Sequence, residues 1–169
     1  MTRYAPLALL LPLCLAATGD ADAIIRQDIQ NATGNCQAAL PAFDGLIRKR
    51  PLAIGNEGTA PAFVTCSLIG DYIAADDTTL LQAVVRNRSA VERTIQCTMV
   101  AGLEYDAAPA TLYVPKSAVL APGSEGLFTW TTADNDDAPI SGPVNLSCML
   151  PPGTVINLTL RAYDEDVGT

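Results

Sequence analysis

The sequence predicts an all-β protein, built as a single antiparallel β-sandwich of about seven or eight strands. Three observations favour this fold. Short segments alternate apolar and polar residues, turn residues recur between them at a spacing of roughly ten to fifteen, and no long amphipathic helix is evident. We expect residues 24–62 to form an N-terminal arm and the first strands, residues 63–169 to form the sandwich body, and the two parts to be one domain.

The clearest alternation is in residues 144–163, on both sides of a Pro-Pro-Gly break. Before the break, Val144, Leu146, Cys148 and Leu150 share one parity. After it, Ile156, Leu158, Leu160 and Ala162 alternate with Asn157, Thr159, Arg161 and Tyr163. We interpret these residues as two adjacent strands, each with one apolar and one polar face, whose apolar face a second sheet must cover.

Residues 1–23 have the pattern of a cleaved secretory signal peptide. Arg3 supplies a positive charge, residues 5–17 are apolar, and Ala21-Asp22-Ala23 fits the small-x-small cleavage rule. Lipidation at Cys14 is the alternative, but Leu13 stands where a small residue is needed. Because this run and all later apolar runs are shorter than the ~20 residues of a membrane span, we expect no transmembrane segment and a secreted or periplasmic protein.

Four cysteines remain after the predicted cleavage: Cys36, Cys66, Cys97 and Cys148. An even number of cysteines behind a signal peptide indicates two disulfides in an oxidising compartment. Three pairings are possible. We favour 36–66 with 97–148, since Cys97 and Cys148 both lie on inward parities of predicted strands.

The elements before residue 120 follow from the same alternation. Residues 24–30 are either a first strand or a loose arm. Residues 36–44 contain a helical turn that ends by Pro41. The basic residues 48–50 are either a solvated segment or a contact patch for an acidic partner. Residues 63–68, 81–86, 94–100 and 111–114 are strands, and Pro115 closes the last. Turns are expected at residues 56–59 and 87–89.

Residues 119–130 combine a hydrophobic pair, a Pro-Gly turn and an aromatic strand that contains Trp130. Bacterial immunoglobulin-like modules often join neighbouring strands in this way, which makes the predicted sandwich immunoglobulin-like. We expect Trp130, the one tryptophan of the chain, to fill the core between the sheets.

Two groups of segments carry a family resemblance. One group runs from Cys36-Gln-Ala-Ala-Leu-Pro-Ala-Phe-Asp44 through Arg50-Pro-Leu-Ala53 and Asn56-Glu-Gly-Thr59 to Phe63-Val-Thr-Cys-Ser67, and the other is Leu146-Ser-Cys-Met-Leu-Pro-Pro-Gly-Thr154 with Tyr163-Asp-Glu-Asp166. In these segments the chain resembles small uncharacterised secreted proteins of Gram-negative bacteria. The resemblance implies export and four paired cysteines, and it implies no activity and no site residues.

Composition removes several kinds of chemistry. The chain has no histidine, which excludes a Ser-His-Asp triad, a Cys-His pair and a histidine-ligated metal. Its net charge of −8 makes nucleic acid an unsuitable partner. The remaining enzymatic option is a carboxylate pair, Glu104 and Asp106, as in a glycan hydrolase.

The best cofactor candidate is calcium at Asp134, Asp136 and Asp137, because close-set carboxylates suit a hard cation. A solvated acidic loop is the alternative, since the segment lacks the glycine and distal glutamate of an EF-hand. For the whole chain we expect a non-catalytic binding or envelope-associated module with a protein or glycan partner, and an exchanged arm at residues 24–30 is one contact mode. The second hypothesis is a secreted hydrolase, or an inhibitor of one, that uses acidic loop residues.

Overall fold

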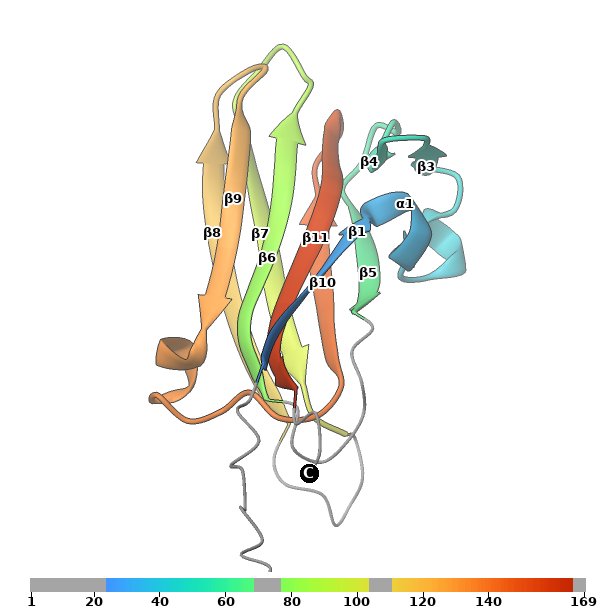
Figure 1. Ribbon diagram of the computed structural model, residues 1–169. Coiled ribbons are helices and arrows are strands. Elements are labelled where there is room, and N and C mark those ends of the chain that lie inside the picture. Colours follow the sequence, from blue (N-terminus) through green and yellow to red (C-terminus); the bar gives the residue numbers. More distant parts are fainter. Residues whose placement is uncertain (1–23, 69–76, 104–110, 166–169) are drawn as a thin grey trace, which may run out of the picture.

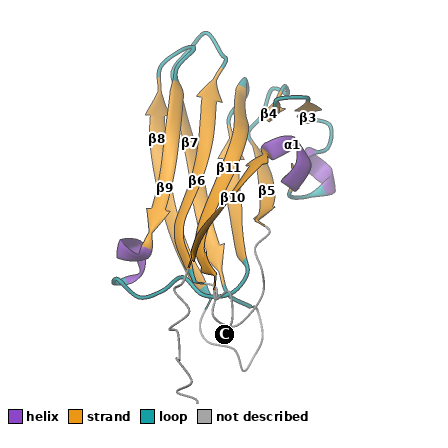
Figure 2. Cartoon of the chain, in the orientation of Figure 1, coloured by secondary structure: helices purple, strands orange, loops and turns teal. Residues whose placement is uncertain are grey.

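The computed structural model describes residues 24–68, 77–103 and 111–165, and it contains two antiparallel sheets packed face to face (Figure 1). Sheet A contains β1 (Ile24–Asn31), β3 (Ile47–Arg50), β4 (Ala53–Asn56), β6 (Thr78–Asn87), β9 (Glu125–Thr131) and β11 (Thr154–Glu165). Sheet B contains β2 (Cys36–Ala38), β5 (Ala62–Leu68), β7 (Arg93–Ala101), β8 (Leu112–Leu120) and β10 (Val144–Leu150). The helical pieces are short turns at the corners of the sandwich (Figure 2), namely α1 (Ala32–Asn35), η1 (Pro41–Phe43) and η2 (Thr132–Asn135).

The strand order is that of a jelly roll. Sheet A has the order β3-β4-β11-β6-β9, with β1 also beside β11, and sheet B has the order β2-β5-β10-β7-β8. From β4 onward the chain changes sheet at every step except the β7–β8 hairpin. The predicted all-β antiparallel sandwich is confirmed, but its connections are those of a jelly roll rather than of an immunoglobulin domain.

The predicted adjacency of the last two strands is wrong. β10 lies between β5 and β7 in sheet B, whereas β11 lies in sheet A between β6 on one side and β1 and β4 on the other. The Pro-Pro-Gly break carries the chain across the sandwich instead of turning it back. Gly153 has a φ of +80° there, and a Cβ at this position would lie 2.8 Å from the Ser89 side chain, so the crossing needs glycine.

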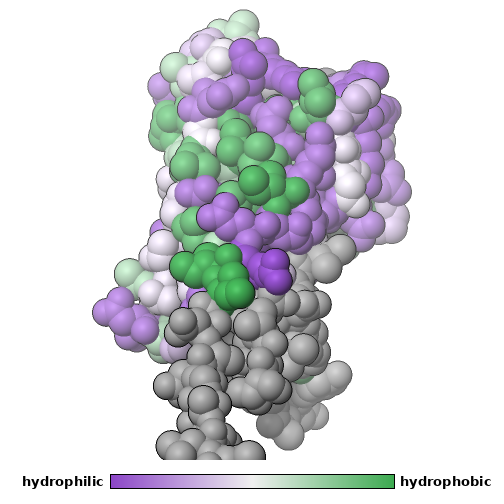
Figure 3. Space-filling model, viewed as in Figure 1, coloured by the Kyte–Doolittle hydropathy of each residue, from purple (hydrophilic) through white to green (hydrophobic). Residues whose placement is uncertain are grey.

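A β-bulge at Asn157 reverses the faces of β11. Ile156 pairs with Val85 and points into the core, but the register shifts before Leu158, which pairs with Val84. Beyond the bulge Thr159 and Arg161 therefore face inward, at 0% and 3% exposure, whereas unbroken alternation predicts that Leu158 and Leu160 face inward. Figure 3 shows the consequence, since apolar side chains gather on the outer face of sheet A.

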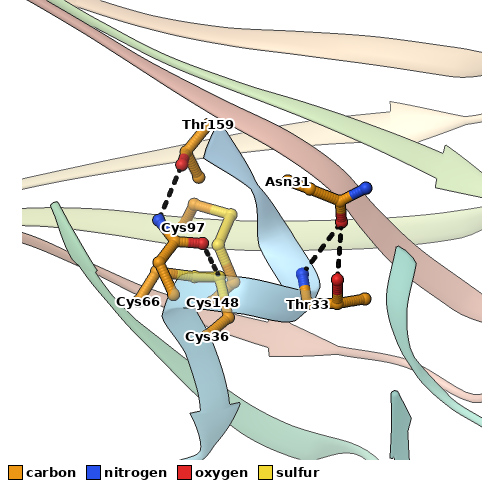
Figure 4. The surroundings of a disulfide bond; sticks show 8 residues. Asn31, Thr33, Cys36, Cys66, Cys97, Cys148 and Thr159 are labelled. Atoms are coloured by element: carbon orange, nitrogen blue, oxygen red, sulfur yellow. Dashed lines mark hydrogen bonds between the residues drawn. A yellow bond between two sulfur atoms is a disulfide. The ribbon is translucent and has the colours of Figure 1, made fainter. Parts of the chain in front are cut away.

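The buried polar groups of β11 have partners. Thr159 Oγ1 accepts a hydrogen bond of 2.8 Å from Asn35 Nδ2 (Figure 4), and Arg161 Nε donates one of 2.8 Å to Thr78 Oγ1. The guanidinium of Arg161 also lies 5.0 Å from the centroid of the Tyr163 ring. These contacts offset the cost of turning polar side chains inward.

Both disulfides lie within sheet B and face the core (Figure 4). Cys36–Cys66 joins β2 to β5, and Cys97–Cys148 joins β7 to β10, each between residues directly opposite in the strand register. The favoured pairing is confirmed. Around them the core contains large side chains from both sheets, including Trp130, Ile54, Leu81, Leu146 and Ile156.

The N-terminal segment takes the first of its two predicted forms, a strand rather than a loose arm. Residues 24–31 form a strand along β11, and β3 and β4 extend the same side of sheet A. The helical turn predicted at residues 36–44 is wrong in position, because Cys36–Ala38 is strand β2 and the turns lie on either side of it. Pro115 does not end its strand either. β8 continues to Leu120, because an edge strand can turn its missing N–H away from its neighbour.

Candidate functional site

The predicted calcium ligands are not equivalent in the structure. Asp134 sits in η2, and its Oδ2 accepts a 2.9 Å hydrogen bond from Lys116 Nζ, which lies 2.8 Å from Oδ1 in the same ion pair. The same carboxylate accepts a 2.9 Å hydrogen bond from the backbone N–H of Thr131, which completes a capping box. The hydrogen bond from Lys116 holds the pKa of Asp134 below its usual value.

The other two aspartates are exposed and follow η2. Asp136 and Asp137 both have positive φ, at 53° and 59°, in the turn that leads the chain toward β10. In the described part of the chain, no group of three or more acidic, cysteine or histidine side chains is arranged to hold a metal ion. Calcium at Asp134, Asp136 and Asp137 therefore stays a prediction. Glu104 and Asp106, the candidate hydrolase pair, lie outside the described residues.

Lys116 lies at one lateral edge of the sandwich, where the edge strands β8 and β9 of the two sheets meet. Its ammonium group donates a 2.6 Å hydrogen bond to the backbone carbonyl of Thr129 and lies 5.9 Å from the centroid of the Trp130 ring. Trp130 Nε1 in turn donates to the carbonyl of Val114 at 2.9 Å. Lys116 is therefore structural, and Ser117 lies on the opposite, exposed side of β8.

The basic segment 48–50 forms β3, an edge strand of sheet A. Arg50 makes two hydrogen bonds to the Glu57 carboxylate, at 2.7 and 2.9 Å, and this contact lowers the pKa of Glu57. Arg48 donates to the backbone carbonyls of Asp44 and Ile47. Two of the three charges thus have partners within the chain, which favours the solvated segment over a contact patch.

The outer face of sheet B is the most distinctive surface of the described residues. The residues between the core positions of β5, β10, β7 and β8 point outward, and the strand register aligns them in three rows. The rows are Phe63-Met149-Gln96-Ser117, Thr65-Ser147-Thr98-Pro115 and Ser67-Asn145-Val100-Tyr113. Gln37 of β2 extends the second row beside Thr65. We call these side chains the sheet B platform.

No side chain of the sheet B platform is charged, although the chain as a whole carries a net charge of −8. Its polar members are hydroxyl and amide groups. Unlike the buried amides of Asn56 and Asn87, they make no side-chain hydrogen bond in the structure and stay available to a ligand. The result is a neutral sheet face that offers hydrogen-bond donors and acceptors beside apolar and aromatic groups.

Aromatic rings stand at two diagonal corners of the sheet B platform. Phe63 is 43% exposed on β5, and its ring contacts Phe43 of η1, with centroids 6.1 Å apart. Tyr113 is 61% exposed on β8. Three strand spacings of ~4.8 Å separate β5 from β8, so the rings are about 14 Å apart across the strands and further along them. Sequence reasoning missed this platform, because its residues come together only once the sheet order is known.

Comparisons with known proteins give only distant similarities. No protein-family model matches the sequence, and no curated protein matches it. Among solved structures, an exo-β-1,3-galactanase from Phanerochaete chrysosporium has a TM-score of 0.41 and 9% identity over 80% of this chain, which spans 29% of the galactanase chain.

Two further structures of this kind are a CBM4 structure and a family 16 carbohydrate-binding module. The CBM4 structure has a TM-score of 0.35 and 13% identity, covering 82% of this chain and 86% of its own. The family 16 module has a TM-score of 0.33 and 14% identity, covering 65% of this chain and 71% of its own. No residue or ligand is transferred from these structures. Among the described residues, no helix has the length and apolar character needed to cross a membrane.

Proposed function

We propose that the protein is an exported, non-catalytic binding module that holds an uncharged, hydroxyl-rich ligand, a neutral glycan, on the sheet B platform. The observation that carries this proposal is the platform's composition. Three aligned rows of outward side chains contain hydroxyl, amide, apolar and aromatic groups and no charge.

A neutral glycan matches these groups chemically. Its hydroxyls donate and accept hydrogen bonds as serine, threonine, asparagine and glutamine side chains do. Binding desolvates no ion, because the platform has none, so the cost of burying unpaired charge does not arise. The C–H faces of sugar rings can pack on the exposed rings of Phe63 and Tyr113.

The shape favours an extended ligand over a small molecule. Small-molecule sites are concave and bury most of their ligand, whereas this surface is the face of a five-stranded sheet. A chain-like glycan can lie across several strands and contact both aromatic corners. Beneath the platform, one disulfide joins β2 to β5 and the other joins β7 to β10.

Binding to a panel of neutral and acidic polysaccharides, measured by affinity electrophoresis and calorimetry, tests the proposal. We expect binding to neutral glycans, a loss of at least tenfold in Tyr113→Ala, and a larger loss in Thr98→Asp, which puts a charge at the centre of the platform. Leu127→Asp is the matched control, since it adds the same charge at an exposed position on the outer face of sheet A.

Two results would overturn the glycan proposal. One is the absence of binding to every neutral glycan tested, and the other is undiminished binding in Tyr113→Ala and Thr98→Asp proteins that melt like the native one. Release of soluble sugars from a bound polysaccharide would instead support the hydrolase hypothesis. Fractionation of the producing cells tests export.

A further inference from the structure

The described strands differ in how their free edges are protected from pairing with another chain. At the seam of β8 and β9, side chains occupy edge groups: Lys116 binds the carbonyl of Thr129, Asp134 binds the N–H of Thr131, and Trp130 binds the carbonyl of Val114. β8 also contains Pro115, which has no N–H to offer. These two edges are closed to a further strand.

The edges at β2 and β3 are protected in other ways. β2 has only three residues, too few to hold a partner strand. β3 carries the consecutive basic residues Arg48, Lys49 and Arg50, so two copies paired along it would set like charges against each other.

β1 has none of these protections. It spans eight residues, Ile24–Asn31, contains no proline, and pairs with β11 on one side only. Ile25 and Ile29 are 65% and 62% exposed, among the highest values for apolar side chains of the described residues. A long, exposed, β-branched edge of this kind is a template for another strand.

The sequence of β1 is complementary to the β1 of a second copy that runs antiparallel to it. Gln27 is at the centre of Ile25-Arg26-Gln27-Asp28-Ile29, with opposite charges one residue to either side and isoleucines two residues to either side. We propose that two copies of this chain join along β1, paired antiparallel about Gln27, so that Arg26 of each copy faces Asp28 of the other and Ile25 faces Ile29.

Pairing in this register matches the side chains on both faces of the joined sheet. On one face the existing row of Ile29 and Leu160 gains Ile25 of the second copy. On the other face Arg161 lies opposite Asp28 within the chain, and Arg26 of the second copy would lie on the other side of Asp28. Opposite charges placed directly across strands favour pairing, as do β-branched pairs.

The neighbouring registers that keep the same faces aligned are disfavoured. Shifting the centre of pairing to Arg26 sets two arginines opposite each other, and shifting it to Asp28 sets two aspartates opposite each other. If the pairing is centred between two residues instead of on one, side chains from opposite faces of the two strands lie across from each other. Isoleucine then lies opposite a charged side chain. Charge and parity together therefore select the register about Gln27.

The join makes one continuous sheet from the two copies of sheet A. Its two-fold axis passes through the Gln27 pair, perpendicular to the sheet, so both sheet B platforms lie on the same side of the dimer. The interface of the dimer uses no platform residue. Dimerisation consequently does not require the proposed ligand.

Sedimentation velocity of the native protein, expressed from its full coding sequence, at concentrations up to roughly 200 µM is the direct test. We expect a dimer for the native chain. Arg26→Asp should weaken the dimer at least tenfold, because it sets acidic side chains opposite each other. Lys49→Asp, which changes the net charge equally on the exposed edge β3, should leave the dimer intact.

Mixing two variants gives the sharper result. Arg26→Asp has two acidic residues beside Gln27, and Asp28→Arg has two basic ones, so each alone should be monomeric and their equimolar mixture should form a heterodimer. A merely structural role for either charge does not predict this rescue. Ile25→Lys is the second probe, since Ile25 lies opposite Asp164 within the chain, where a lysine is tolerated, while across the dimer it removes an apolar pair.

Circular dichroism of each variant verifies folding, and Ile25→Lys keeps the test decisive if Asp28→Arg does not fold beside Arg161. A native protein that is monomeric throughout the concentration range refutes the proposal. So does a dimer that Arg26→Asp and Ile25→Lys leave unchanged, or a mixture of folded charge variants that stays monomeric.

Discussion

At the scale of single residues, Lys116 and Asp134 form an ion pair that joins the two sheets along the edge strands β8 and β9. The lysine bridges from sheet B to the carbonyl of Thr129 in sheet A, and the aspartate receives both this ammonium group and the N–H of Thr131. Both side chains are only partly exposed, at 33% and 22%, so solvent screens the pair incompletely. The ion pair should therefore contribute measurably to stability.

Replacement of Asp134 by asparagine tests this contribution through its pH dependence. Because the folded-state pKa of Asp134 is lowered, its stabilisation is fully present above the unfolded carboxyl pKa of about 4 and is lost as the pH falls through the lower folded value. Urea unfolding should show Asp134→Asn less stable by about 1–2 kcal/mol at neutral pH, with little difference in strong acid. Asp137→Asn, at an exposed turn position, is the control, and a deficit independent of pH would contradict this account.

At the scale of elements, the same asparagine arrangement occurs at two crossings from sheet A to sheet B. Asn56 ends β4 and Asn87 ends β6, and both are buried. Each donates through Nδ2 to the carbonyl four residues later and to the last carbonyl of a sheet B strand, Leu150 or Leu120, at 2.7–2.9 Å. Each also accepts from the N–H two residues later.

Loss of either amide should therefore destabilise the connection that it holds between the two sheets. Asn87→Ala removes the amide's hydrogen bonds to three carbonyls and from one N–H, although the carbonyls of Val91 and Ala121 keep donors from Ser89 and Ser124. We expect a loss of about 3 kcal/mol in the free energy of unfolding, with Asn56→Ala close to it. Asn87→Asp should be nearly as costly, since a carboxylate cannot donate. Denaturant titration measures all three, with Asn145→Ala on the outer face of sheet B as the control; equal stability of Asn87→Ala and Asn145→Ala would exclude the role.

The sequence was enough to locate most strands but not to assemble them. Alternation predicted residues 63–68, 94–100 and 144–150, which are β5, β7 and β10 to within a residue or two. Asn56 and Asn87 were recognised only as turn residues, because local pattern does not reveal that their amides reach distant carbonyls. The bulge at Asn157 has no local marker, and it changed which face of β11 is buried.

The candidate site could not be predicted from the sequence for a related reason. The residues of the sheet B platform come from five separate strands, and their lack of charge is meaningful only when the strand order aligns them. The acidic residues that the sequence emphasised include Asp134, whose carboxylate turned out to be held by Lys116. The favoured cysteine pairing, in contrast, is confirmed, although the inward parity of Cys97 and Cys148 favoured it without excluding the other two pairings.

At the scale of the whole molecule, the two proposals assign different surfaces to different tasks. β1 and the apolar outer face of sheet A (Figure 3) lie on one side, and the sheet B platform lies on the other. A dimer joined about Gln27 keeps both platforms facing one way. Such a dimer can hold a long glycan at two places at once, and the second contact is then intramolecular.

This arrangement predicts that dimerisation affects long ligands only. Arg26→Asp should lower the apparent affinity for a polymeric neutral glycan by roughly 10²-fold, because it removes the second contact, and should leave the affinity for a short oligosaccharide unchanged. Tyr113→Ala should weaken both, since each platform loses a ring. Calorimetry with matched polymer and fragment separates the two effects. Equal losses for polymer and fragment in Arg26→Asp would mean that β1 touches the ligand itself, and that bivalent binding does not operate.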